Sequence, residues 1–125
     1  MPGAFTHLAA AGAMFAVGWY YFKEYFQASD KTKKLAYLGI VCVIFTFIPD
    51  IFLVIYYTTH VLSFSTLLPY HDALYIIVGP IAVAGIIFLK FGPNIKYKPI
   101  FIMGMWCMIL HVIMDYFLPD HGIWY

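Results

Sequence analysis

Long apolar runs separated by short polar breaks dominate this sequence. Four of the runs are close to the length of about 20 residues that a helix needs to cross a hydrocarbon core of about 30 Å. They cover residues 4–26, 35–57, 73–91 and 99–118. The pattern predicts an all-α integral membrane protein with one domain, a four-transmembrane-helix bundle.

The breaks between the runs are polar or contain residues that end helices. QASDKTKK follows the first run, and a mixed segment, 58–72, follows the second. The third break, KFGPNIKYKP, contains Gly92, Pro93 and Pro99, which end one helix and begin the next. No basic residue precedes the first run, so we expect a spanning helix there rather than a secretory signal.

Composition also favours a membrane protein. Of the 125 residues, 64% are hydrophobic and 10% are charged, and the mean hydropathy is +0.86. A soluble domain of this length could not bury so much apolar surface. The net charge of +1 argues against nucleic acid as a partner, so the lipid bilayer is the expected surroundings. Cys42 and Cys107 lie inside apolar runs and are expected to be small packing residues.

The seven basic residues are all lysines, and they predict an orientation. They flank the first and third connections, at Lys23, Lys31, Lys33 and Lys34 and at Lys90, Lys96 and Lys98. Positively charged connections tend to stay in the cytoplasm. With four spans, the N- and C-termini and the 58–72 segment would lie on the outer side of the cell membrane.

Histidines and acids gather in the outer half of this predicted topology. His7 begins the first run, Asp50 lies late in the second, and His111 and Asp115 lie in the fourth. An ionisable side chain inside a membrane is costly, so it is usually functional or paired. His111 and Asp115 are four residues apart and share one helix face. Pro49 is expected to kink the second helix and turn Asp50 inward.

These side chains form a candidate metal site. Imidazole nitrogen and carboxylate oxygen are ligands of zinc and copper. We therefore predict a transition metal ion, zinc or copper, at His111 and Asp115, within reach of Asp50 and His7. The alternative is a polar clasp without metal, in which a charged His111 lies between Asp50 and Asp115. Other polar residues of the outer side are expected to be solvated: His60, His71, Asp72, Asp120 and His121.

The first run also carries a stripe of small residues, Ala9, Gly12, Ala13 and Ala16. Small side chains allow helices in a membrane to approach each other closely. We expect this face to contact a helix of a partner subunit.

The order of several short motifs resembles that of a known family. THLAAAG near the start, PDI at 49–51, TH at 59–60 and HVIMDYFLPDHGIW at 111–124 resemble the YdjM-type (DUF457) inner-membrane proteins, which are metal-dependent hydrolases. The resemblance implies metal-binding roles for His7, Asp50, His60, His111 and Asp115. Two parts of the family pattern are missing: the chain has no arginine for a His-Arg-Gly segment, and Phe52 stands where a second acid is expected.

Three functions fit these observations. The first is a non-catalytic accessory subunit of a larger membrane enzyme complex, since the sequence has no nucleophile elbow or phosphate-binding loop. One host that we consider is a copper-dependent membrane monooxygenase of the ammonia or methane type. The second is a metal-dependent membrane hydrolase with Asp50 or Asp115 as the base. The third is a small transporter or proton relay that uses Asp50, His111 and Asp115.

Overall fold

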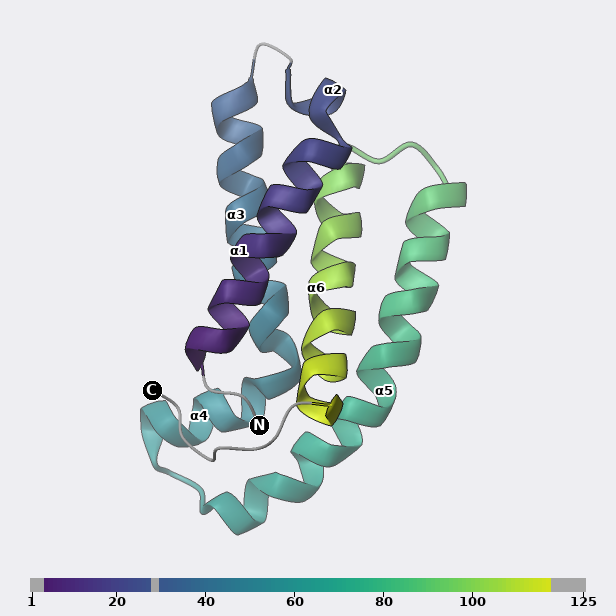
Figure 1. Ribbon diagram of the computed structural model, residues 1–125. Coiled ribbons are helices and arrows are strands. Elements are labelled where there is room, and N and C mark those ends of the chain that lie inside the picture. Colours follow the sequence, from purple (N-terminus) through teal and green to yellow (C-terminus); the bar gives the residue numbers. More distant parts are fainter. Residues whose placement is uncertain (1–3, 28–29, 118–125) are drawn as a thin grey trace.

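The computed structural model describes residues 4–27 and 30–117, which are built from helices (Figure 1). The elements are α1 (Ala4–Tyr21), α2 (Lys23–Phe26), α3 (Lys31–Phe47), the 3-10 turn η1 (Ile48–Asp50), α4 (Ile51–Thr59), α5 (Phe64–Phe91) and α6 (Lys98–Phe117). α6 packs against α1, α3 and α5, and α1 also packs against α3. α4 crosses the end of the bundle that lies opposite α2 (Figure 1).

Three helices, rather than four, are suited to cross a membrane, so the predicted four-transmembrane-helix bundle is wrong in its count. In the described residues, the helices that are long and apolar enough are Lys31–Asp50, Phe64–Phe91 and Lys98–Phe117. α1 has 18 residues, but it is rich in weakly apolar Ala and Gly and contains His7 and two terminal tyrosines. These residues lower the mean hydropathy of α1, and it is not among the helices that are long and apolar enough to span. The prediction that both termini lie on the outer side is not tested by this count and stays a prediction.

The second predicted run, 35–57, is broken at its proline. α3 ends at Phe47, Ile48–Asp50 form one 3-10 turn, and α4 leaves in a new direction (Figure 1). Proline lacks an N–H and clashes with the preceding helical turn, which explains a break at Pro49. The turn places the Asp50 side chain inside the bundle, where it is 1% exposed.

α5 begins earlier than the predicted start at residue 73. Ser63 caps the helix, because its hydroxyl accepts a hydrogen bond of 3.3 Å from the backbone N–H of Thr66. The helix then continues through Pro69 to Phe91. Most of the segment predicted as a loop is therefore helical, and His71 is buried rather than solvated.

α3 and α6 approach each other closely at Gly104. A Cβ atom added to Gly104 would lie 2.5 Å from Phe45 Cδ2 and 2.7 Å from Val41 Cγ1, so a larger residue would push the helices apart. Cys42 and Cys107 are buried in the same interface as free thiols, in agreement with the packing role predicted for them. This close packing lies about one to two turns from Asp50 and His111.

The small-residue stripe of α1 faces away from the other described helices. Ala9, Gly12, Ala13 and Ala16 are all exposed. A Cβ atom added to Gly12 would meet nothing within 4 Å. No other helix in the described part of the chain covers this face.

Candidate metal centre

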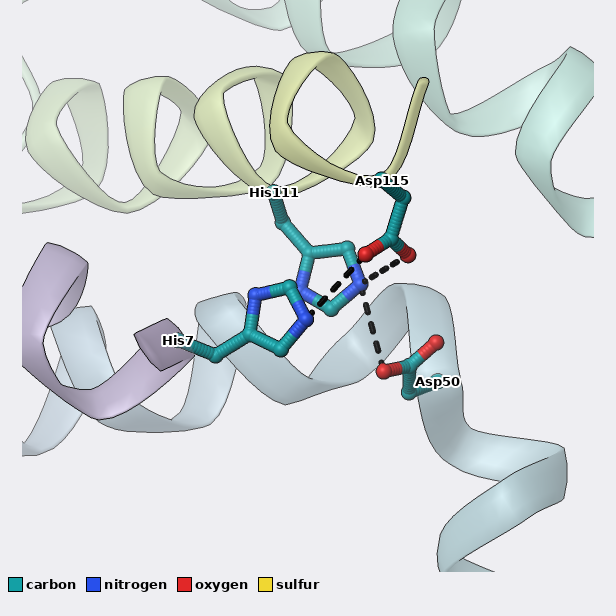
Figure 2. Close-up of side chains that lie close together, drawn as sticks. All are labelled: His7, Asp50, His111 and Asp115. Carbon is teal, nitrogen blue, oxygen red and sulfur yellow. Dashed lines mark ion pairs between the residues drawn. The ribbon is translucent and has the colours of Figure 1, made fainter. Parts of the chain in front are cut away.

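Four ionisable side chains from three helical elements meet inside the bundle. His7 comes from α1, Asp50 from η1, and His111 and Asp115 from α6. Figure 2 shows the four side chains pointing toward one another. One potential ligand atom of each lies within 4.8 Å of those of the other three. All four side chains are 3% exposed or less, so water is largely excluded from the group.

The local structure of each element explains how the group forms. His111 and Asp115 are one turn apart on α6, and His111 Nε2 lies 3.1 Å from Asp115 Oδ2. The break at Pro49 brings Asp50 Oδ2 to 3.3 Å from the same nitrogen. His7, in the first turn of α1, places its Nε2 3.2 Å from Asp115 Oδ1.

The two imidazole rings lie face to face. The centroids of the His7 and His111 rings are 3.9 Å apart, and the ring planes differ by 11°. Two protonated rings would repel each other strongly at this distance, because little water is present to screen them. An imidazole lone pair lies in the plane of its ring, so one of the two nearly parallel rings would have to tilt before both could bind the same ion.

The contacts within the group leave buried polar atoms without hydrogen bonds. His111 Nε2 is within 3.3 Å of oxygens from Asp50, Asp115 and Tyr75, but a ring nitrogen offers one hydrogen or one lone pair. The atoms without a hydrogen-bond partner among the described residues are both His7 ring nitrogens, His111 Nδ1, Asp50 Oδ2 and both Asp115 carboxylate oxygens. Buried polar atoms are normally satisfied. A cation would bind nitrogen lone pairs and carboxylate oxygens together.

The distances and charges fit a divalent transition metal ion. Zinc bonds of about 2.0–2.2 Å in a tetrahedral site place the ligand atoms roughly 3.4 Å apart. The closest contacts, at 3.1, 3.2 and 3.3 Å, are near this value. All four ligand atoms lie within 4.8 Å of one another, so the side chains would have to move closer together to surround one ion. Two carboxylates neutralise the charge of a divalent ion, which lowers the cost of placing it in an apolar bundle. The group could therefore hold a metal ion.

Asp50 is held in place by two side chains of α5. The Tyr75 hydroxyl donates a hydrogen bond of 2.9 Å to Asp50 Oδ1, and His71 Nε2 lies 2.9 Å from the same oxygen. Asp50 Oδ2 remains directed at His111. Residues that orient a metal ligand in this way commonly raise metal affinity. Nδ1 of His71 also lies 3.3 Å from the exposed carboxylate of Asp72, so a chain of contacts joins the site to the surface.

The structure brings together four of the five metal ligands named from the sequence. His60 is the exception: it is exposed at the end of α4, its backbone is left-handed with φ of 52°, and its ring contacts Tyr56. His60 therefore has no geometric link to the other four. Asp120 and His121 lie outside the described residues.

Sequence analysis missed two residues of the site, His71 and Tyr75. His71 was expected in a solvated loop, and Tyr75 was not considered. The sequence does contain a signal for this pair, namely their spacing of four residues. This spacing places both side chains on one face once the helix extends back to the Ser63 cap.

No protein-family model, curated protein or solved structure matches this chain. The resemblance to the YdjM-type (DUF457) proteins therefore remains a hypothesis. The evidence for the candidate metal centre is therefore the geometry of its four side chains.

Proposed function

We propose that this chain is a membrane protein that holds one divalent transition metal ion with His7, Asp50, His111 and Asp115. The observation that carries the proposal is the convergence of four buried ligand atoms within 4.8 Å, drawn from three separate elements. Zinc is the first candidate, because imidazole and carboxylate ligands in a tetrahedral set suit it. Copper(II) shares these ligands but prefers a tetragonal arrangement.

The proposed role of the ion is to join helices rather than to catalyse a reaction. Structural zinc sites have four protein ligands, whereas catalytic sites keep one position open for water or substrate. Here four side chains, each 3% exposed or less, could supply four ligand atoms. A hydrolase would need one of them to leave the ion, so the ligand count favours the non-catalytic interpretation.

The interpretation as an accessory subunit of a larger membrane complex remains a prediction from the sequence. The exposed face of α1 around Gly12 is the observation that favours it, because a stripe of small residues suits close packing against another helix. A monooxygenase host has no structural observation behind it and stays a prediction as well.

The proton-relay alternative retains one supporting observation. The contacts from Asp72 through His71 to Asp50 connect an exposed carboxylate with the buried group. The same contacts also serve to orient Asp50 as a ligand, so they do not favour a relay over metal binding.

Metal analysis of the purified protein tests the proposal. The full chain, purified in mild detergent from cells supplied with zinc, is expected to contain about one metal ion per chain by mass spectrometry of the elements. His111→Ala and Asp50→Asn should each abolish the bound metal, because each removes a ligand that no neighbour replaces. His60→Ala is the matched control and should retain the wild-type metal content.

Thermal unfolding distinguishes the metal site from the alternative, a polar clasp without metal in which a charged His111 lies between Asp50 and Asp115. A chelator should lower the Tm of the wild-type protein and leave the Tm of His111→Ala unchanged. A metal-free wild-type protein that loses stability in His111→Ala would show instead that a charged imidazole joins the two carboxylates. Full metal content in His111→Ala would also overturn the proposed ligand set.

A further inference from the structure

An apolar groove lies between α1, α5 and α6, away from the metal centre. Its volume is about 460 Å³, within the range of roughly 300–1,000 Å³ that small-molecule sites show. Its wall includes Met14 and Val17 of α1, Ile86 and Lys90 of α5, and Met103 and Trp106 of α6. From Met14 to Tyr21 the groove follows α1 for roughly 10 Å at a rise of 1.5 Å per residue.

Lys90 provides the charged group of this otherwise apolar groove. It lies in the last turn of α5, and Tyr21 at the end of α1 lines the same groove. No carboxylate of the described residues lies within ion-pair distance of the Lys90 ammonium, in contrast to Lys34, which pairs with Asp30 at 3.3 Å. The Lys90 ammonium lies over the Phe91 ring, 5.5 Å from its centroid, and this contact leaves its positive charge available to an anion.

The end of the bundle around Lys90 has the features of a membrane–water interface. The other six lysines also lie there, on α2, at the start of α3 and around the start of α6 (Figure 1). Lys31 lies over the ring of Trp19, Lys33 over Tyr37 and Lys34 over Tyr25. Lysines and aromatic rings of this kind are found at the level of lipid headgroups.

We propose that this groove binds an anionic phospholipid, with an acyl chain against Met14, Val17 and Trp106 and the phosphate at Lys90. The apolar wall runs into the bundle from the level of the headgroups, and the unpaired ammonium stands at its interfacial end.

Lipid retention during purification tests the proposal. The full chain is reconstituted in vesicles of phosphatidylglycerol and phosphatidylcholine with identical acyl chains, then extracted in mild detergent, and the lipids that remain bound are counted by mass spectrometry. The wild-type protein should retain phosphatidylglycerol over phosphatidylcholine by about fivefold relative to the starting mixture, the effect expected of one lysine near the headgroups. Lys90→Gln should return the ratio to that of the mixture.

Two further variants identify the groove itself. Val17→Trp fills the apolar wall and should remove both lipids, whereas Lys33→Gln removes an exposed lysine outside the groove and should leave the wild-type ratio unchanged. A wild-type ratio equal to that of the mixture, or an unchanged ratio in Lys90→Gln, would overturn the proposal. A particle with the mass of two chains that separates in Val17→Trp would show that a second copy occupies the groove, and would overturn it as well.

Discussion

Asp50 uses its two carboxylate oxygens in different ways. Oδ1 contacts His71 and Tyr75 of α5, and Oδ2 faces His111 of α6. The carboxylate therefore has one orientation relative to the ligands of α6 before any ion binds. A ligand that is already oriented loses less conformational entropy when it binds, which raises affinity.

Removal of the Tyr75 hydroxyl tests the role of this orientation. Tyr75→Phe keeps the ring but removes the hydrogen bond to Asp50 Oδ1, so metal affinity should fall by about 10- to 100-fold, the usual effect of such supporting residues. Competition with a chromophoric chelator measures the affinity. Tyr37→Phe, at the lysine-rich end of the bundle, is the matched control and should bind metal as the wild type does. An unchanged affinity in Tyr75→Phe would show that His71 and packing hold Asp50 without the Tyr75 hydroxyl.

Single residues also show how far the sequence could predict the site. The spacing of His111 and Asp115 fixes their shared helix face, and Pro49 indicates the turn that buries Asp50, so these ligands were accessible from local rules. His71 was not, because its burial depends on α5 reaching back to Ser63. The local sequence, a polar segment with Pro69, predicts a loop. In the structure the segment is helical because it packs against Asp50.

At the level of elements, the approach of α3 and α6 sets the distance across the candidate metal centre. Asp50 follows α3 and His111 belongs to α6, so the two ligands move with these helices. Gly104 sits where side chains of α3 press closest to α6. A change at Gly104 should therefore affect both stability and metal binding, although the residue is not a ligand.

The pair Gly104→Ala and Gly12→Ala tests this coupling. In Gly104→Ala the added methyl group meets Phe45 and Val41, so the protein should lose about 1–3 kcal/mol of stability and bind metal more weakly. In Gly12→Ala the methyl group meets open space, so stability should be unchanged or should rise by up to about 1 kcal/mol. Thermal unfolding at fixed zinc concentration measures both variants. Equal Tm values for the two variants would contradict the close approach.

Element boundaries explain why the predicted number of spans was wrong. The length of the first run predicts a spanning helix, but α1, which contains His7, two glycines and two terminal tyrosines, is not among the helices that are long and apolar enough to span. α1 instead packs along α3 and α6 and supplies His7 to the centre. The helical class itself was correct, because long apolar runs leave few other ways to satisfy the backbone.

For the whole molecule, the lysines and the metal centre occupy opposite ends. Lys31 begins α3 and Lys98 begins α6, whereas Asp50 follows α3 and Asp115 lies in the last turn of α6. This arrangement holds for three spans as it did for four. The positive-inside rule then favours a cytoplasmic location for the lysine-rich end and an outer location for the end that contains the centre.

Labelling of single cysteines tests this orientation in intact cells. In a background in which Cys42 and Cys107 are replaced by alanine, Ser63→Cys should react with a membrane-impermeant thiol reagent added from outside. Thr32→Cys should react only after the membrane is permeabilised. Both positions are exposed in the structure, so access to the reagent depends on the side of the membrane. The reverse pattern would place the centre on the cytoplasmic side.

The distribution of the ligands along the chain has a consequence for biosynthesis. A growing chain is made from its N-terminus, so His7 and Asp50 are synthesised before His111 and Asp115. Until α6 is inserted, Asp50 lacks its neighbours from α6, such as His111. An acid without such partners is costly in lipid. If the group holds a metal ion as proposed, the full set of ligands becomes available to the ion only after α6 has been inserted.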